Sequence, residues 1–332
     1  MSKIKDTDYL SLSARIRAME NRLLTQERME RMLEARTGEE SAKVLAECGY
    51  GELSELTHAA LDALIAEARS DLYRELRGAA PDVRLVEAFQ MKYDYHNAKV
   101  LLKAQAVSGE ADRLLAGGGR WSAAAMKEAF QRDDLRDFTD VFRQALTQAQ
   151  ELLSAGGDPQ LADFVLDRAY FEEMRAAAQE SGSAFLQGYV SLLIDATNLR
   201  SAVRAGRMGK GAEFQNQVLL PGGGVDPHTL ATGKSGDMAA AFRSGPLAEA
   251  AALGAALSNP GSGELTAFER ACDNALMRYL TQARQVAFGE QTLIGYLYAR
   301  ESEFTAIRTI LSGRMAGLEA DTIRERLREA YV

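Results

Sequence analysis

Asp94 and His96 lie two residues apart in the run from Tyr93 to Asn97, and a carboxylate and an imidazole are groups that enzymes use for general acid–base catalysis. On a helix, residues two apart point roughly 200° away from each other. The pair could therefore act together only with a partner from elsewhere in the fold. The alternative is structural: Asp94 and Asn97 share a helix face and cap or cross-link a neighbouring helix, while His96 lies at the surface. We favour the structural interpretation.

Other patterns for chemistry are incomplete. None of the three histidines belongs to an HExxH motif, so the sequence predicts no metal site. Gly233-Lys234-Ser235 resembles the end of a phosphate loop, but His228 stands where that loop requires its first glycine. No GxSxG or CxxC motif occurs. The sequence therefore predicts no catalytic residue, no cofactor and no metal.

Composition excludes several classes of protein. The 332 residues carry 39 Lys and Arg against 47 Asp and Glu, for a net charge of −8; no basic surface for nucleic acid is expected. Cys48 and Cys272 are isolated in sequence, which is typical of a reduced compartment. Met1 to Asp8 do not form a secretory signal. The longest apolar stretch, Leu247 to Leu257, is interrupted by Glu249 and is far shorter than the ~20 residues of a membrane span.

Helical periodicity runs along the whole chain, whereas alternating patterns typical of strands are nearly absent. Apolar residues recur at helical spacing in two clear stripes: Tyr9, Leu12, Ile16, Met19 and Leu23, and Leu61, Leu64, Ile65, Ala68, Leu72 and Leu76. Helix starts are marked by Thr37 with Glu40, by Asp158 before proline and by Asp226 before proline. The sequence predicts an all-α fold.

One short pattern occurs three times, about a hundred residues apart. An acid is followed three residues later by asparagine, or by alanine in the last copy, and five residues later by a base. The three copies are Asp94, Asn97 and Lys99; Asp195, Asn198 and Arg200; and Glu303, Ala306 and Arg308. A second marker, two leucines, one further residue and three glycines, occurs at residues 114–119 and again at 219–224. Two markers at nearly one spacing indicate triplication.

We therefore expect three helical repeats, over residues 1–110, 111–213 and 214–332. Each should end in a long helix, a turn and a second long helix that carries the acid and the base. Leu166-Asp167-Arg168-Ala169 resembles Phe268-Glu269-Arg270-Ala271 at the matching place in the first long helix. A tripled module is more typical of a protein that presents a surface than of one built around a single cleft.

The repeated residues are expected to hold helices together. Residues five apart on a helix lie ~140° apart, so the acid and the base of one copy must face different neighbours. A packing role explains three occurrences better than a catalytic role does. Ala306 lacks the amide, which makes the third copy a weakened version. We expect Asp94→Ala to lower stability by roughly 1–3 kcal/mol if its partners are buried.

Several of these segments resemble a known family. They are the run Lys92 to Asn97 with Lys99 to Lys103, the two glycine-rich segments, Ala299 to Leu311, and the terminal Ile323 to Val332. Together they look like the C subunit of the bacterial and archaeal V-type (A-type) ATPases, the counterpart of the d subunit of the eukaryotic V-ATPase. The resemblance covers essentially the whole chain. Ala306 departs from the family's acid, asparagine and arginine form, at a structural position.

The resemblance implies a non-catalytic rotor subunit in the central stalk of a rotary ATPase. The subunit would be a funnel of three related helical domains about a pseudo-threefold axis. It would join the membrane proteolipid (c) ring to axle subunits of the D and F types, on the cytoplasmic face, as a peripheral part of a membrane complex. It would pass torque for ion transport or ATP synthesis. The alternative is a soluble helical-repeat scaffold for another protein; an enzyme centred on Asp94 and His96 ranks third.

Overall fold

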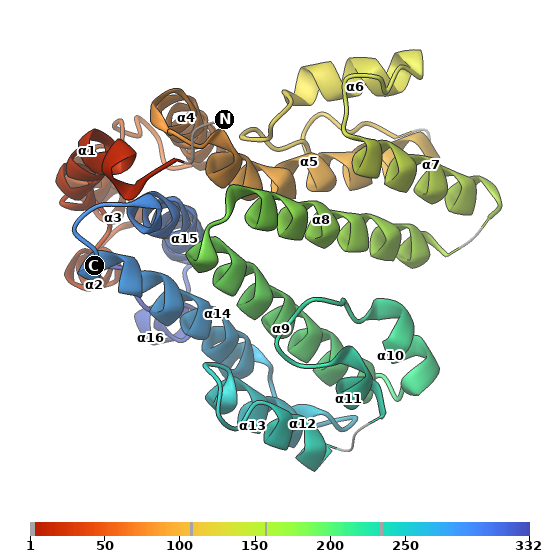
Figure 1. Ribbon diagram of the computed structural model, residues 1–332. Helices are drawn as coiled ribbons and strands as arrows, with labels where there is room; N and C mark the ends of the chain where they lie inside the picture. Colours follow the sequence, from red (N-terminus) through yellow and green to blue (C-terminus); the bar gives the residue numbers. More distant parts are fainter. Residues whose placement is uncertain (1–3, 107–108, 157, 233–234) are drawn as a thin grey trace. The chain divides into compact units, whose positions relative to one another are not determined.

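A computed structural model describes residues 4–106, 109–156, 158–232 and 235–332 (Figure 1). Throughout these residues the backbone forms helices joined by turns and loops, and no β-strand occurs among them. The predicted all-α fold is therefore confirmed. No helix in the described part of the chain is both long and apolar enough to cross a bilayer. Gly233 and Lys234 of the phosphate-loop-like triplet lie outside the described residues, as do the first three residues.

The helices follow one another closely along the chain. In order they are η1 (Asp6–Tyr9), α1 (Leu10–Glu20), α2 (Gln26–Glu34), α3 (Gly38–Glu47), α4 (His58–Ala79), α5 (Val83–Ala106), α6 (Ala123–Arg132), α7 (Asp140–Ser154), α8 (Pro159–Ser181), α9 (Ala184–Arg207), α10 (Ala212–Val218), α11 (Pro227–Thr232), α12 (Ser235–Ala241), α13 (Ala248–Leu257), α14 (Thr266–Thr281), η2 (Gln282–Gln285), α15 (Glu290–Met315) and α16 (Ala320–Arg324).

The expected pairs of long helices are present. A short turn joins α4 to α5 and another joins α8 to α9, while α14 leads into α15 through η2 (Figure 1). The second helix of each pair carries one copy of the repeated pattern, because Asp94 lies on α5, Asp195 on α9 and Glu303 on α15. The predicted sequence of long helix, turn and patterned helix is therefore confirmed.

Polar side chains start the helices where the sequence indicates. Thr37 Oγ1 accepts the backbone N–H of Glu40 at 3.2 Å, although the Glu40 carboxylate binds the N–H of Arg36 instead of completing a box with Thr37. Asp158 and Asp226 each accept the N–H two residues later, at 2.9 Å. These bonds satisfy N–H groups that the first helical turn leaves unpaired.

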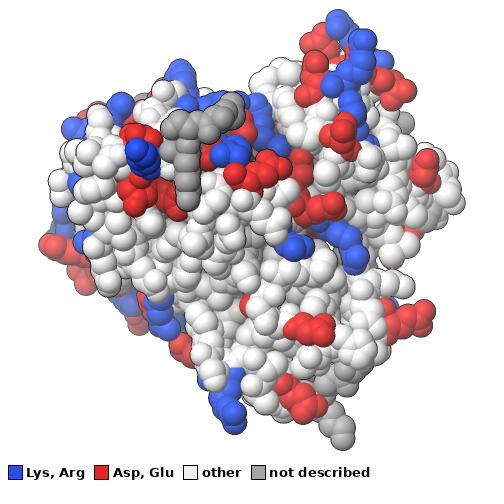
Figure 2. All heavy atoms as spheres, viewed as in Figure 1, with Lys and Arg blue, Asp and Glu red and all other residues white. Residues whose placement is uncertain are grey.

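The described chain divides into two compact units, one of residues 1–68 with 191–332 and the other of residues 69–190. The boundaries fall inside α4 and α9, so the units do not coincide with the three expected repeats, which stay a prediction. On the face seen in Figure 2, acidic and basic side chains are interspersed.

In the unit of residues 69–190, α8 packs against α5 and α7. An aromatic cluster fills the space between them. Trp121 meets Phe138 edge to face with ring centroids 4.8 Å apart, and Tyr95 meets Phe142 in the same way at 4.9 Å. Such contacts add to the burial of apolar area.

In the other unit, α15 is the central helix. It contacts α1, α2, α3, α14 and α16, and its apolar residues are buried along its length: Leu293, Ile294, Leu297, Ile307, Ile310 and Leu311. A helix with this much of its length buried is a core element, although Thr305 and Arg308 of α15 are exposed. The third copy of the pattern therefore lies in the most enclosed helix of this unit.

Close packing of α13 gives a first prediction. A Cβ on Gly254 would approach Val203 Cγ2 to 2.8 Å and Phe268 Cε2 to 2.9 Å, whereas a Cβ on Gly78 of α4 would meet nothing within 4 Å. Gly254→Ala should lower the free energy of unfolding, because overpacking costs about 1–3 kcal/mol against about 1 kcal/mol of gained helix propensity. Gly78→Ala, the control, should be neutral or stabilising. Urea midpoints of both variants test this, and an unchanged or higher midpoint for Gly254→Ala would contradict it.

Candidate functional site

The first copy of the pattern binds the loop that contains the glycine triplet. Asp94 on α5 is fully buried, at 0% exposure. Its Oδ2 accepts Nε of Arg120 at 2.6 Å, and its Oδ1 accepts the backbone N–H of Trp121 at 3.4 Å. One helix residue thus holds both the side chain and the backbone that follow the triplet. The buried carboxylate therefore has an opposite charge beside it, on Arg120, and hydrogen-bond donors for both of its oxygens.

The amide of the first copy holds the same loop one turn further along. Asn97 Nδ2 donates to the carbonyl of Ala116 at 2.8 Å, and Asn97 Oδ1 accepts the N–H of Ala116 at 2.7 Å. An asparagine side chain carries both the donor and the acceptor that are needed to bind the C=O and the N–H of one residue. Asp94 and Asn97 therefore bind one loop together, where the sequence predicted a neighbouring helix.

Arg120 joins the loop to a further helix. Its Nη2 donates to Oε2 of Glu173 on α8 at 2.9 Å, and that carboxylate also accepts the hydroxyls of Tyr95, at 3.0 Å, and Thr139. Arg120 and Glu173 are 9% and 7% exposed at the side chain. This buried network was missed from the sequence, although Arg120 directly follows the glycine triplet.

The second copy repeats this arrangement, and its partners among the described residues are backbone groups. Asp195 on α9 accepts the N–H of Gly224 at 2.9 Å and that of Val225 at 3.1 Å. Asn198 binds both the N–H and the carbonyl of Leu220, at 2.7 and 2.8 Å. The two markers of the sequence therefore meet in space in both of the first two copies.

Steric contact explains why glycine recurs beside the acid. A Cβ on Gly119 would overlap Oδ1 of Asp94, and a Cβ on Gly223 would overlap Oδ1 of Asp195. The backbone can come close enough to bind the carboxylate only where no side chain intervenes. The acid and the glycine triplet are consequently two halves of one interaction.

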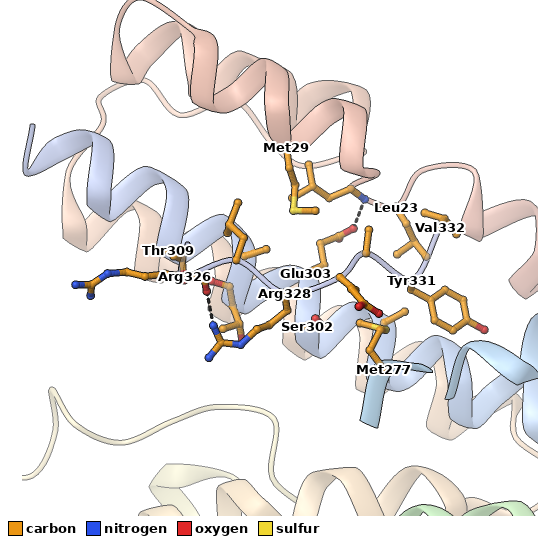
Figure 3. A pocket seen from close by; sticks show the side chains of 17 residues that line it. Leu23, Met29, Met277, Ser302, Glu303, Thr309, Arg326, Arg328, Tyr331 and Val332 are labelled. Carbon is orange, nitrogen blue, oxygen red and sulfur yellow. Dashed lines mark hydrogen bonds between the residues drawn. The ribbon is translucent and has the colours of Figure 1, made fainter. Parts of the chain in front are cut away.

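The third copy takes its loop from the other end of the chain (Figure 3). Glu303 on α15 accepts the N–H of Leu24 at 2.5 Å, a bond that Figure 3 shows. Its carboxylate also accepts the hydroxyl of Tyr50 at 2.5 Å and Nη1 of Arg300 at 2.7 Å. Ala306 lines the neighbouring pocket. Glutamate is one methylene longer than aspartate, and Glu303 binds a backbone N–H directly, as Asp195 does in the second copy.

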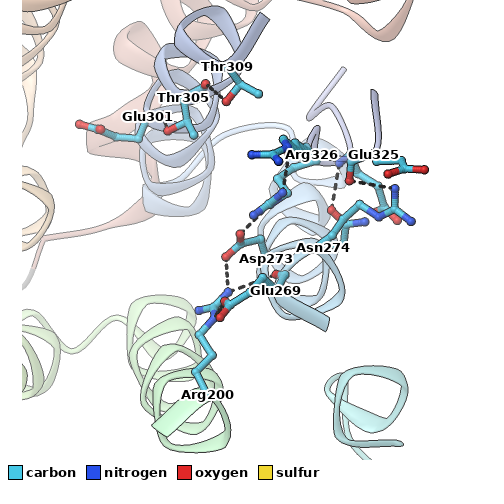
Figure 4. A network of polar contacts seen from close by, with 12 residues as sticks. Arg200, Glu269, Asp273, Asn274, Glu301, Thr305, Thr309, Glu325 and Arg326 are labelled. Atoms are coloured by element: carbon cyan, nitrogen blue, oxygen red, sulfur yellow. Dashed lines mark hydrogen bonds and ion pairs between the residues drawn. The ribbon is translucent and has the colours of Figure 1, made fainter. Parts of the chain in front are cut away.

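The base of each copy pairs with an acid on a different long helix. Lys99 meets Asp167 of α8 at 2.6 Å, and Arg308 meets Asp62 of α4 at 2.8 Å. Arg200 binds Glu269 of α14 at 2.6 Å and also Asp273 (Figure 4). As expected, the acid and the base of a copy face different neighbours.

These pairs follow a cyclic order along the sequence. The base of the first copy binds the first helix of the second helix pair, the second copy binds the third pair, and the third copy returns to α4 of the first pair. Asp167 and Glu269 stand at the matching positions that the sequence indicated. Asp62 was missed. The apolar Leu61 precedes it, but the residues after Asp62 differ from those after Asp167 and Glu269.

Burial dominates the electrostatics of the three acids. It raises the pKa of Asp94 to about 6, against the opposing effect of Arg120. It also raises the pKa of Asp195, opposed by the N–H groups of Val225 and Gly224, and that of Glu303, opposed mainly by Arg300. All three pKa values shift upwards, because desolvation disfavours the charged carboxylate.

The arrangement does not bring Asp94 and His96 together. Asp94 is buried against Arg120, whereas His96 is exposed and its Nε2 lies 2.9 Å from the carbonyl of Leu114. In the described part of the chain, no group of three or more His, Cys, Asp or Glu side chains is placed to hold a metal ion. What these residues do is fasten loops and helices to each other.

An all-helical protein of helix pairs, each with an acid and a base at matching positions and two with an amide between them, is the class that the fold and these contacts define. The chain belongs to the ATP synthase (C/AC39) subunit family, which it matches over residues 12–326. The resemblance inferred from the sequence is thereby confirmed.

Individual relatives agree over nearly the full chain. The C subunit of the V-type sodium ATPase of Enterococcus hirae is 24% identical over 325 residues, covering 98% of this chain and 99% of the relative. The C subunit of the V-type ATP synthase of Thermus thermophilus is 24% identical over 332 residues, covering 96% and 98%. The C subunit of the A-type ATP synthase of Methanocaldococcus jannaschii is 25% identical over 354 residues, covering 96% and 86%.

The contact between loop and acid predicts different results for two glycines of the triplet. A Cβ on Gly119 overlaps Asp94 and lies 3.1 Å from the carbonyl oxygen of Trp121, whereas a Cβ on Gly117 meets nothing within 4 Å. Gly119→Ala should lower the free energy of unfolding by about 1–3 kcal/mol, since the loop must move off the carboxylate. Gly117→Ala should change it by less than about 0.5 kcal/mol. Equal denaturation midpoints for the two variants would refute this account of the triplet.

The raised pKa of Asp94 predicts a pH-dependent loss in Asp94→Ala. The pKa of about 6 in the folded protein exceeds the ordinary value of 3.8, so the folded state holds the proton more tightly than the unfolded state does. The contribution of Asp94 to stability is then greatest in acid and declines as pH rises through about 6. Asp94→Ala should cost about 1–3 kcal/mol near neutral pH, and more near pH 4.5.

A matched control for this experiment is Asp134→Ala, because Asp134 pairs with Arg136 in an exposed position. Its removal should leave the midpoint nearly unchanged at both pH values. Unfolding curves of both variants and of the wild-type chain supply the comparison. An Asp94→Ala variant that melts like the wild type, or that loses more stability at pH 7 than at pH 4.5, would show that the account is wrong.

Proposed function

We propose that this chain is a non-catalytic rotor subunit in the central stalk of a V-type or A-type rotary ATPase. It would form a socket between the axle subunits of the D and F types and the membrane proteolipid ring. There it would pass torque for ion transport or ATP synthesis, as a peripheral part of the membrane complex on its cytoplasmic face. The observation that carries the proposal is the family match over residues 12–326.

The pattern of fastening supports a mechanical role. A coupling element has to transmit force without bending, and long helices packed at crystal-like density resist bending. The acid of each copy is buried, and its bonds tie a loop to a long helix of the core. These bonds have no evident use in turnover, but they would stiffen a helical body.

The cyclic order of the three ion pairs, each made by the basic residue of one copy, supports a closed arrangement of three repeats. We propose that residues 1–110, 111–213 and 214–332 form three related domains about a pseudo-threefold axis in a funnel. Lys99, Arg200 and Arg308 would then be equivalent residues at the three junctions. The return of Arg308 to Asp62 is the contact that a closed set of three requires and an open solenoid lacks.

The alternative is a helical-repeat scaffold for a soluble partner. Tripled helical modules serve that role in other proteins, and the bonds described above would serve it equally well. The two candidates differ in their partners: a rotor subunit has a ring-facing and an axle-facing end, whereas a scaffold would bind through one concave surface.

Co-purification distinguishes the two. The tagged chain is expressed in its native host, membranes are dissolved in mild detergent, and bound polypeptides are identified by mass spectrometry. We expect a proteolipid together with the axle and nucleotide-binding subunits. A tagged Gly119→Ala variant, compared at matched expression, shows how recovery depends on the folded chain. Recovery of soluble proteins alone would reject the rotor and favour the scaffold.

A further inference from the structure

An open groove of about 730 Å³ lies beside the third copy of the pattern. Its walls come from the end of α9, the start of α14, the last turns of α15, and the chain from residue 318 to 328, all within the unit of residues 1–68 and 191–332. Among the residues that line it are Arg204, Glu269, Arg308, Arg326 and Arg328. Four arginines thus line the groove with a single carboxylate.

Among the described residues, one of these arginines has no acidic partner. Arg326 is exposed and makes no ion pair with another described residue, whereas Arg328 is held in place by Asp273 at 2.7 Å. A guanidinium offers five donors in a rigid fork that fits a carboxylate. Arg326 is therefore free to receive a carboxylate from another molecule.

Two further arginines can exchange partners at low cost. The side chains of Arg204 and Arg308 are 60% and 54% exposed, although they contact Glu269 and Asp62 respectively. Exposed pairs of this kind contribute about 0–1 kcal/mol. A carboxylate arriving in the groove could therefore bind these guanidinium groups with little loss inside the protein.

The groove also offers apolar surface. Leu318 lines it while 40% exposed, and the partly buried Leu265 lines it too. α14 begins at this place with Leu265 as its N-cap and no side-chain cap, so the positive end of that helix adds to the field of the arginines. The surface thus combines basic and apolar contacts, the combination suited to an amphipathic acidic segment.

We propose that this groove binds an acidic segment of another protein subunit, with Asp or Glu side chains against Arg326, Arg308 and Arg204 and an apolar side chain against Leu318. The occupant is a protein segment and not a small anion, because the apolar wall would go unused by phosphate. The proposal rests on the rotor-subunit function, since it names the chemistry of one partner of that subunit.

Photo-crosslinking from Arg326 tests the proposal. The codon for Arg326 is replaced by one for p-benzoylphenylalanine, the full chain is expressed in its native host, and the detergent-solubilised complex is irradiated. The crosslinked peptide is then sequenced by mass spectrometry. We expect a segment of another subunit that is rich in Asp and Glu. The same probe at Arg136, an exposed arginine on the unit of residues 69–190, should not give that peptide.

Charge reversal adds a second measurement. Arg326→Glu should weaken rebinding of the chain to a complex stripped of it by about tenfold, and Arg136→Glu should leave rebinding unchanged. The proposal is overturned if the chain co-purifies with its complex while Arg326 gives no crosslink or captures a segment poor in Asp and Glu. Rebinding is also measured with inorganic phosphate added. The proposal is overturned if phosphate removes the difference in rebinding between Arg326→Glu and the wild type and no crosslink forms. Failure to co-purify would instead reject the rotor function itself.

Discussion

A buried carboxylate on a long helix is the constraint on which the surrounding structure depends. Removing Asp94 from water is unfavourable, so the chain must supply donors at close range. The chain does this with a loop whose backbone approaches the carboxylate directly, and only glycine at position 119 permits that approach. The loop is in turn fixed by Asn97. One unfavourable burial therefore sets the sequence of both the helix and the loop.

The third copy shows that the buried carboxylate needs hydrogen-bond donors but does not need the same residue types to supply them. Glu303 and Ala306 differ together from the aspartate and asparagine of the other copies. Glu303 accepts the Leu24 N–H, and Tyr50 and Arg300 supply further donors to its carboxylate. Because no glycine triplet faces this acid, the loop before α2 can carry side chains.

Much of the fold follows from the sequence, because apolar periodicity, caps and the repeated acid are local signals. The helix pairs and the separation of acid and base were predictable in this way. The partners were not. Arg120 and Glu173 meet only in space, and nothing about Asp62 identifies it as the partner of Arg308 until α4 and α15 are folded. The division into two compact units, with boundaries inside α4 and α9, could not be predicted from the repeats either. It depends on packing between elements that are far apart in sequence.

The base of each copy does different work from the acid. Burial, the largest influence on the Arg200 guanidinium, acts to lower its pKa, yet Asp273 and Glu269 raise it above its ordinary value. Arg308, by contrast, makes one exposed ion pair beside an open groove. Equivalent positions have thus diverged: one is committed to holding helices together, whereas the other retains donors that can turn outward. The exposure of the Arg308 pair, beside a groove that further arginines line, is what distinguishes the last copy from the second.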